Sequence, residues 1–436
     1  MSLSRIASRR GSSALFLVAL FALGGALNSA RSQAARQITF NKDIAPILQE
    51  SCQNCHRPGN IAPMSLLTYK DARPWARSIK QQVSLRNMPP WFMDKNIGIR
   101  SFKDDVSLSA AQIATITAWV DAGAPEGNPA DLPPARHFED LDKWHIGKPD
   151  LIVKMPVEYM VKPASSDWWG NFVADSGLTE DRYIKAVETK PSSGGGIRVV
   201  HHAVTSIFYD DGSSAPGTLN EYAVGKYGDI YPEDSGKLMK AGAKIRFNMH
   251  YHAVGEVIGD RSEVAFVFYP KGYVPKHVMN TVLAPNNDDL DIPAGADNVR
   301  SDAYFKLDRP ARLTGYQPHM HNRGKAQCLE AIYPNMVVEQ LNCVNRYNFG
   351  WQIAYSYADD VTPLLPAGTI LHTITWHDNS AANPFNPDPR NWVGFGNRTT
   401  EDMSRAWLNF YYLTDEEFKA ETAARRAKAA SLRSAR

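Results

Sequence analysis

The sequence predicts a multidomain protein in which a small all-α domain precedes two all-β antiparallel sandwich domains of jelly-roll type. Three observations support this fold class. The chain has 436 residues, which is more than one compact core accommodates. A segment near the N-terminus shows helical periodicity with recognisable helix ends. From about residue 150 the sequence alternates between apolar and polar runs broken by Gly, Pro, Asn and Asp, which is typical of antiparallel strands.

The overall composition is that of an ordinary globular protein. Hydrophobic residues make up 43% and charged residues 22% of the chain, so disorder is not expected. The formal net charge of +2 is close to balance. It gives no reason to expect nucleic acid as a partner.

Residues 1–34 are interpreted as a signal peptide. Arg5, Arg9 and Arg10 precede an apolar run over residues 14–27, and small residues follow that run. An uncleaved membrane anchor is the alternative, although the run is short for a bilayer span. No later stretch approaches membrane-spanning length. We therefore expect an exported protein, periplasmic or secreted, with no membrane span in the mature chain.

A haem-attachment motif follows at Cys52-Gln53-Asn54-Cys55-His56. In a C-x-x-C-H motif the two thiols form thioethers to the porphyrin, and the histidine becomes the proximal iron ligand. A redox dithiol and half of a zinc site are the alternatives. A zinc site requires a second Cys/His cluster, and none occurs before His137. The motif predicts one covalently attached haem c, held by Cys52, Cys55 and His56.

The surroundings of the motif favour the same interpretation. A helix is predicted over residues 108–123, with a capping box at Ser109 and Gln112. The arrangement strongly resembles a small class I cytochrome c domain covering residues 38–126. A Pro-rich and charged linker is expected over residues 127–149.

Met88 is the predicted sixth iron ligand. It lies between the motif and the last helix, where such cytochromes place their methionine, and the prolines that follow it stiffen the backbone. Met64 and Met93 are the alternatives, because methionine is more often a core filler than a ligand.

The other two cysteines, Cys328 and Cys343, are expected to form a disulfide. A two-residue turn at Asn335-Met336 would place them opposite each other on a hairpin. An exported compartment is oxidising, so we interpret this disulfide as structural.

Eight of the 12 histidines occur in clusters or pairs after residue 150. These are His201 with His202, His250 with His252, His319 with His321, and His372 with His377. Repeated pairs at metal-ligand spacing are poorly explained as isolated core residues. Sites rich in imidazole suit copper and zinc better than calcium or magnesium.

Strand geometry decides which imidazoles can meet. In an extended strand His250 and His252 project from one face, as do His319 and His321. His201 and His202 are neighbours and point to opposite faces of a regular strand. They can serve one ion only if the strand is bulged, strongly twisted or ending there, or if they use different ring nitrogens.

The order of the motifs is informative. They are Asp181 to Glu188, Arg198 to His202, Asn248 to Tyr251, Gln317 to His321 and Thr400 to Met403. In this order and spacing they resemble the copper type II, ascorbate-dependent monooxygenases, the family of dopamine β-monooxygenase and the peptide-amidating hydroxylase. The resemblance covers most of residues 150–413.

The resemblance implies two copper ions on successive β-sandwich domains, residues 150–287 and 288–413, that face each other across a cleft. The electron-transfer copper would be held by His201, His202 and His250. The oxygen-activating copper, where catalysis occurs, would be held by His319, His321 and Met403. A thioether ligand such as Met403 favours Cu(I). A basic tail, residues 414–436, follows.

Departures from the family bear on the substrate. Gln317, Arg405 and Trp407 stand where the amidating enzymes bind a peptide carboxylate with Arg, Asn and Tyr. Peptide amidation is therefore not expected, and Trp407 suggests an apolar or aromatic substrate. Ser404 replaces a cysteine of the animal enzymes, so one of their disulfides is absent.

The leading hypothesis is a copper monooxygenase that inserts one atom of O₂ into a C–H bond of a small organic substrate. Its electrons would come through the fused haem from an external donor, either an ascorbate-like reductant or a periplasmic redox protein. One alternative is a non-catalytic periplasmic haem/copper electron-transfer or copper-binding protein. Another is a zinc hydrolase, although the histidine motifs contain no obvious carboxylate.

Overall fold

The structure is a computed structural model. It describes residues 36–138, 143–193, 195–213, 218–223, 226, 228–284, 289–351 and 353–434. The predicted signal peptide, residues 1–34, lies outside these residues. Residues Ile38–Arg436 form one compact unit. Within the described residues, no helix is both long enough and apolar enough to cross a membrane.

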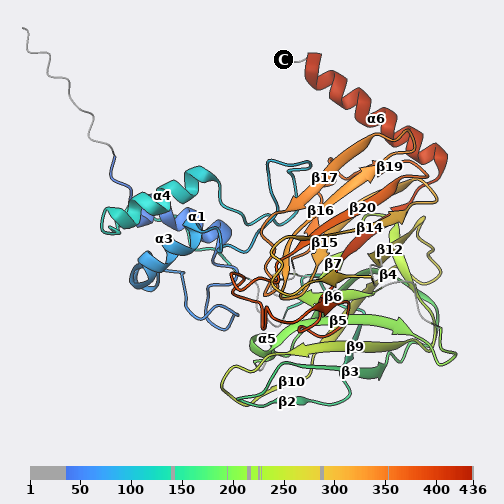
Figure 1. The fold of residues 1–436 in the computed structure, drawn as a ribbon, viewed down its shortest axis with the longest axis horizontal. Coiled ribbons are helices and arrows are strands. Elements are labelled where there is room, and N and C mark those ends of the chain that lie inside the picture. The colour runs from blue at the N-terminus through green and yellow to red at the C-terminus, as the bar shows by residue number, and fades with distance from the viewer. Residues whose placement is uncertain are drawn as a thin grey trace, which may run out of the picture. The chain divides into compact units, whose positions relative to one another are not determined.

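A ten-stranded sheet is the largest element of the fold (Figure 1). Its strands follow the order β1 (Leu151–Lys154), β11 (Glu263–Phe268), β4 (Arg182–Lys190), β8 (Ser235–Met239), β12 (His277–Ala284), β22 (Arg405–Tyr412), β15 (Ala311–His319) and β18 (Tyr355–Ser356). Two further short strands join it, β7 (Asp229–Ile230) on β4 and β19 (Leu364–Leu365) on β15.

Strand β12 links the two halves of the β region. It pairs in parallel with β8 through His277 and Val278, and antiparallel with β22 along Met279 to Ala284. The sheet therefore passes from strands of the first predicted sandwich to strands of the second without interruption. Backbone hydrogen bonds thus join the two halves.

Two four-stranded sheets complete the layers. The first has the order β3 (Trp168–Asp175), β9 (Lys244–Tyr251), β5 (Val200–Phe208) and β6 (Asn220–Ala223). The second has the order β14 (Val299–Lys306), β20 (Ile370–His377), β16 (Gly324–Ile332) and β17 (Val338–Val344). Two short ribbons pair β10 (Ile258–Asp260) with β2 (Tyr159–Val161), and β13 (Asp291–Ile292) with β21 (Val393–Gly394).

Each half has its own apolar core. In the first, Phe247 and Met249 of β9 are buried in one cluster with Val264 and Phe266 of β11. Alternate residues of β9 therefore face the core, as expected for a sheet covered on one side. Burying a side chain such as Phe247 contributes about 1.5–3 kcal/mol. The second core gathers residues of β15, β16, β17 and β22.

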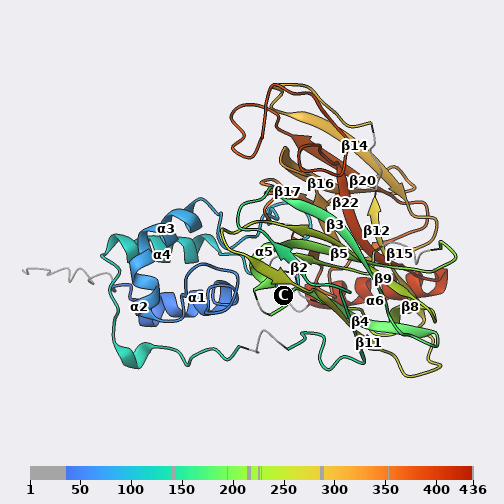
Figure 2. The same ribbon diagram turned by 90° about the horizontal axis from the view of Figure 1, so that it is seen from below.

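Most helices are short and lie before the β region. They are η1 (Phe40–Ile44), α1 (Ala45–Ser51), α2 (Tyr69–Ala72), η2 (Arg73–Trp75), α3 (Ala76–Ser84), α4 (Ala110–Asp121) and η3 (Pro129–Asp131). The predicted capping box is present at the start of α4, where Ser109 accepts from the Gln112 backbone N–H. Helices α1, α3 and α4 lie together in both views (Figures 1 and 2) and share a small apolar cluster around Trp119. Two more helices occur later, α5 (Gly196–Val199) and α6 (Asp415–Ser434).

The predicted fold class, an all-α cytochrome c domain followed by two separate sandwiches, is wrong. Sheets dominate the described residues, and the helices before residue 126 do not form a distinct domain, because they belong to the same compact unit as the β region. The segment between α3 and α4 is the physical reason. Met93 and Phe102 are buried in the second β core, where they bridge to Val344 and Tyr357.

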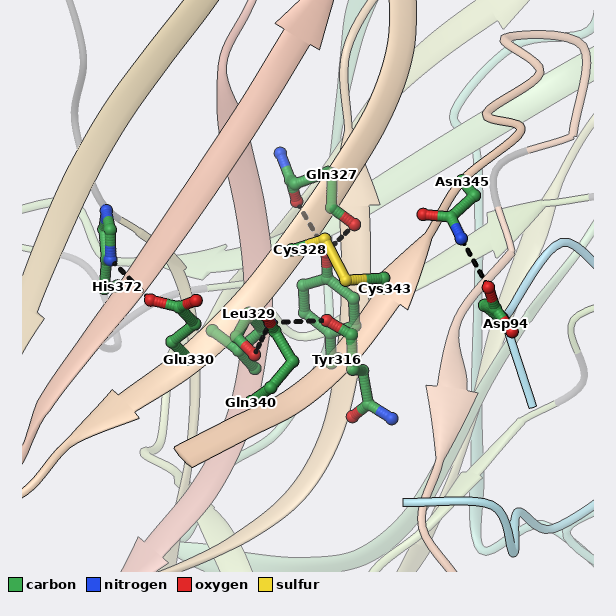
Figure 3. The surroundings of a disulfide bond; sticks show 11 residues. Asp94, Tyr316, Gln327, Cys328, Leu329, Glu330, Gln340, Cys343, Asn345 and His372 are labelled. Carbon is green, nitrogen blue, oxygen red and sulfur yellow. Dashed lines mark hydrogen bonds and ion pairs between the residues drawn. A yellow bond between two sulfur atoms is a disulfide. The ribbon is translucent and has the colours of Figure 1, made fainter. Parts of the chain in front are cut away.

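Further contacts hold this segment to the hairpin formed by β16 and β17. The Asp94 backbone N–H donates to the Cys343 carbonyl at 2.8 Å, and the Ile99 N–H donates to the Leu341 carbonyl at 2.9 Å. Asp94 also accepts from the side chain of Asn345 (Figure 3). The helical segment is therefore attached to the β region by backbone pairing as well as by apolar burial.

The disulfide between Cys328 and Cys343 is present on that hairpin, next to the Gln327–Val344 pair at the end of the ladder away from the turn (Figure 3). The predicted two-residue turn is not. Ile332 pairs with Val338, which leaves a five-residue connection, and Met336 in it has a positive φ of 64°. A bulge farther along the hairpin shifts the register by one residue and returns the two cysteines to opposite positions.

Removal of the disulfide by a Cys328→Ala/Cys343→Ala double substitution is expected to lower the free energy of unfolding by about 3 kcal/mol. The chain-entropy model gives this value for the 15-residue separation of the two cysteines. Denaturant unfolding of the full chain, with the reduced wild-type protein as control, measures it. Identical unfolding midpoints for the oxidised wild type and the double variant would contradict the expectation.

Candidate metal centres

Three predicted copper ligands come together where β5 pairs with β9. His202 and His250 are cross-strand partners, and the pairing is irregular between Val200 and His202. This irregularity places one extra residue, His201, in β5 opposite the regular ladder of β9. The bulge required for His201 and His202 to serve one ion is therefore present.

The three imidazoles have the spacing of a metal site. Their potential ligand atoms all lie within 4.8 Å of one another. The Nδ1 atoms of His201, His202 and His250 are buried and have no hydrogen-bond partner among the described residues. An unsatisfied buried polar atom costs about 1–3 kcal/mol. Three such atoms, one on each of three neighbouring imidazoles, fit a bound cation well.

Burial keeps these imidazoles neutral. Burial, together with the nearby His250, lowers the pKa of His201 to about 4. The pKa of His202 falls well below its ordinary value, again chiefly through burial. Burial also lowers the pKa of His250. Metal binding requires the neutral ring, so protons compete weakly for this site near neutral pH.

Two residues that the sequence did not identify contact His250. They are Asp167, just before β3, and Trp169 within it. The Asp167 carboxylate accepts from His250 Nε2 at 2.9 Å and from His252 Nδ1 at 2.8 Å. Burial alone would raise the pKa of Asp167, but the hydrogen bonds from the two histidines hold it at about 2. Trp169 stacks on the His250 ring with a centroid distance of 4.0 Å. The Asp167-x-Trp169 spacing does not by itself indicate a metal site.

The second predicted pair lies at the end of β15. His319 is the last residue of that strand, and the His319 and His321 rings are 5.6 Å apart between centroids. His321 Nδ1 lies 3.0 Å from the Glu401 carbonyl oxygen, to which it donates. This hydrogen bond leaves His321 Nε2 as the atom available to a metal.

Met403 is held beside this pair by Asp402. One Asp402 oxygen accepts from the backbone N–H groups of His321 and Met403, each at 2.8 Å, and the other accepts from the Arg323 N–H at 3.0 Å. Burial would raise the pKa of Asp402, but the neighbouring His377 and His321 and these N–H donors hold it at about 2. The ionised carboxylate therefore joins the two chain segments that carry the predicted ligands.

One cleft of about 1060 Å³ is lined by residues of both sets. His202 comes from the first set, and His319, His321 and Met403 come from the second. The half-buried ring of Phe349, which also lines the cleft, lies 5.5 Å from the His201 ring and 5.7 Å from the His321 ring between centroids. The two sets are thus neighbours, separated by a single aromatic ring at this point.

Gln317, Arg405 and Trp407, where the sequence departs from the family that it resembles, lie close to this cleft. Gln317 is a cross-strand partner of Trp407, and its amide donates to Glu221 at 2.5 Å. Trp407 lines the cleft, and its buried indole N–H has no hydrogen-bond partner among the described residues. The Arg405 guanidinium lies over the Phe395 ring. Trp407 therefore contributes apolar surface to the cleft, and its indole N–H is buried.

The remaining histidines of the pairs have structural partners. His377 is buried, with Nε2 3.1 Å from the Met403 carbonyl oxygen. His372 lies between two carboxylates, 3.1 Å from Glu330 and 2.8 Å from Asp302. His252 contacts Asp167, as described above. None of these three belongs to a cluster of metal-ligand geometry among the described residues.

The haem-attachment residues lie just after α1. Cys52 and Cys55 are partly buried free thiols, and burial raises the pKa of Cys52 to about 12. His56 Nδ1 lies 3.3 Å from the Met64 carbonyl oxygen, which leaves Nε2 as the atom available to an iron. Two free thiols, and a histidine whose Nδ1 is hydrogen-bonded so that Nε2 can bind iron, fit the attachment of a c-type haem.

The methionines considered as the sixth iron ligand differ in environment. Met93 is buried in the second β core, so it acts as a core residue. Met64 packs against the small helical cluster. Met88 is half-buried and precedes a cis proline. Its assignment stays a prediction.

No protein-family model and no curated protein matches this chain. Among solved structures, the VP2 subviral particle of infectious bursal disease virus is similar, with 12% identity over 64% of this chain and 74% of that chain, and a TM-score of 0.17. A two-domain protein of unknown function from Bacteroides fragilis is also similar, with 11% identity over 56% of this chain and 84% of that chain, and a TM-score of 0.15. Oxalate decarboxylase from Bacillus subtilis has 9% identity over 65% of this chain and 80% of that chain, and a TM-score of 0.14. Values this low define neither a family nor a function for the chain.

An Asp402→Asn substitution is expected to destabilise the protein by about 3 kcal/mol or more at neutral pH, because it leaves a backbone N–H of the ligand loops facing an amide donor. Since the folded-state pKa of Asp402 lies below its unfolded value of about 3.9, the stabilisation is complete above that value. It is lost as the pH falls toward 2. Denaturant unfolding at several pH values measures the difference.

The matched control is Asp308→Asn, which changes an exposed carboxylate of the same half. It should leave the unfolding midpoint nearly unchanged. Equal free energies of unfolding for wild type and Asp402→Asn at neutral pH would contradict the role given to Asp402. So would a difference in that free energy that does not shrink between pH 4 and pH 2.

Proposed function

We propose that this protein is a copper-dependent monooxygenase that hydroxylates a C–H bond of a small organic substrate. The observation that carries the proposal is that two sets of predicted copper ligands line, or lie beside, one large cleft. The ordered motifs that resemble the copper type II monooxygenases support it independently.

His201, His202 and His250 would hold the electron-transfer copper. Three neutral imidazoles with unpaired Nδ1 atoms are a donor set that suits an ion cycling between Cu(I) and Cu(II). His319, His321 and Met403 would hold the oxygen-activating copper, where the thioether favours Cu(I). A zinc hydrolase is less well supported, because neither set contains a carboxylate and Met403 is a poor zinc ligand.

When bound, copper supplies reversible one-electron chemistry and the activation of dioxygen. The hydroxylation consumes one O₂, two electrons and two protons, and it yields the alcohol and one water. The residues of the chain orient the reactants for this reaction. Asp402 holds the His321 and Met403 segments together, and the cleft receives the substrate beside them.

The lining of the cleft favours an apolar or aromatic substrate with a polar group. Trp168, Trp169, Trp407 and Phe349 provide flat apolar surfaces. Polar side chains of the lining, among them Asn171, Asn248 and Thr399, are available to a polar group of the substrate. Aromatic walls exclude water from the reacting C–H bond, which protects the reaction from uncoupled side chemistry.

Electrons would enter through a haem c attached to Cys52 and Cys55, with His56 as iron ligand. The haem would receive them one at a time from an ascorbate-like reductant or a periplasmic redox protein. Attachment to the same chain raises the effective concentration of the donor, which is the physical advantage of the fusion. Export of the chain would place it where c-type haems and disulfides occur.

The decisive experiment supplies ¹⁸O₂ to the copper-loaded and reduced protein with a panel of small aromatic and aliphatic compounds. We expect one ¹⁸O atom in a hydroxylated product, detected by mass spectrometry. Met403→Ala should lower the initial rate of product formation about tenfold or more, which corresponds to about 1.4 kcal/mol. The control is Met160→Ala, at an exposed methionine far in sequence from both ligand sets.

Three results would contradict the proposal. They are product oxygen derived only from water, an absence of oxygen uptake with every compound, and Met403→Ala activity equal to that of the control.

A Cys52→Ser/Cys55→Ser double variant tests the electron route. It should lose the haem absorbance and hydroxylate only slowly when a reduced periplasmic redox protein is the electron donor. Undiminished hydroxylation by that variant would contradict the route through the haem.

A further inference from the structure

We propose that Asp167 is a positioning residue that fixes the tautomer and the orientation of His250, so that Nδ1 of this ring faces the metal. The inference rests on the proposed function, because it takes His201, His202 and His250 as a metal site. It assigns a role to a carboxylate that no sequence motif identified.

The first argument is the choice of ring nitrogen. Asp167 Oδ2 lies 2.9 Å from His250 Nε2, and an ionised carboxylate only accepts hydrogen bonds. The proton of the neutral His250 ring must therefore be on Nε2. The lone pair is then on Nδ1, the buried atom without a hydrogen-bond partner among the described residues. This is the arrangement by which a carboxylate prepares a histidine to bind a metal.

The second argument is that Asp167 is itself held in place. Its other oxygen, Oδ1, accepts from His252 Nδ1 at 2.8 Å. His250 and His252 project from one face of the same chain segment, so a single carboxylate reaches both rings. The His252 side chain is 61% exposed, whereas that of His250 is fully buried. His252 therefore serves as an outer support that fixes the carboxylate against the buried ligand.

The third argument is the packing of the ring. Trp169, two residues after Asp167, is the cross-strand partner of His250 and stacks on it with an interplanar angle of 21°. One element therefore holds His250 at two places, by a hydrogen bond at its edge and by an indole on its face. A purely structural ion pair would need neither the stacked ring nor an unpaired Nδ1 on its far side.

The affinity of the full-length protein for Cu(I) tests the role, with a chromophoric chelator as competitor. Asp167→Ala removes both acceptors and should weaken binding at the three-histidine site about 10- to 100-fold. Asp167→Asn retains one carbonyl acceptor and should recover part of the loss. The matched control is Asp175→Asn, at an exposed carboxylate at the far end of the strand that follows Asp167, which should bind copper like the wild type. The Cu(II) EPR parameters should change in the Asp167 variants and not in the control.

A second measurement uses the metal-free wild-type protein and does not depend on how the variants fold. In ¹⁵N-histidine-labelled protein, with His250 assigned through His250→Gln, the proton should be on Nε2. A proton on Nδ1, or wild-type affinity and EPR parameters in Asp167→Ala, would overturn the inference. If the wild type binds copper no better than a His201→Ala/His202→Ala variant does, the proposed metal site itself fails.

Discussion

The pairing of β12 with both β8 and β22 is the constraint on which the candidate site depends. Through it one sheet runs from β1, β11, β4 and β8 of the first half to β22 and β15 of the second, where β15 ends at His319 and β22 begins two residues after Met403. Hydrogen-bonded strands do not slide or rotate freely, so the two ligand sets keep their separation. The Phe349 ring, in contact distance of a histidine from each set, occupies the space between them. The cleft is lined by residues of the four-stranded sheet of β3, β9, β5 and β6 and by residues of β12, β15 and β22 of the ten-stranded sheet.

Around each set, a buried or half-buried carboxylate holds the predicted ligands by hydrogen bonds, and both carboxylates have a pKa of about 2. Asp167 contacts the ring of His250, whereas Asp402 accepts from the backbone N–H groups of His321 and Met403. The ligands therefore differ in how they are held, one through its side chain and the others through the main chain. The unpaired Nδ1 atoms at the centre of the first set are unfavourable for the metal-free fold. Proteins tolerate such local conflicts mainly at functional sites.

Part of this arrangement follows from the sequence and part does not. Strand periodicity placed His250 and His252 on one face, and the adjacency of His201 and His202 required a bulge, because these arguments depend only on local geometry. The fold class failed because Met93 and Phe102 were assigned to an independent helical domain, whereas they bury against residues more than 200 positions away. Asp167 was missed for the same reason, since it is 83 residues from His250 and belongs to no local motif. The joining of the two halves through the antiparallel pair of β12 with β22, 121 residues or more apart in sequence, likewise cannot be read from local patterns.

The most direct test of the central claim is anomalous X-ray scattering at the copper and zinc absorption edges on crystals of the purified protein. Two copper peaks per chain are expected, one bounded by His201, His202 and His250 and the other by His319, His321 and Met403. Zinc at both positions, or no peak inside the three-histidine cluster after copper loading, would contradict the assignment of this protein as a copper monooxygenase.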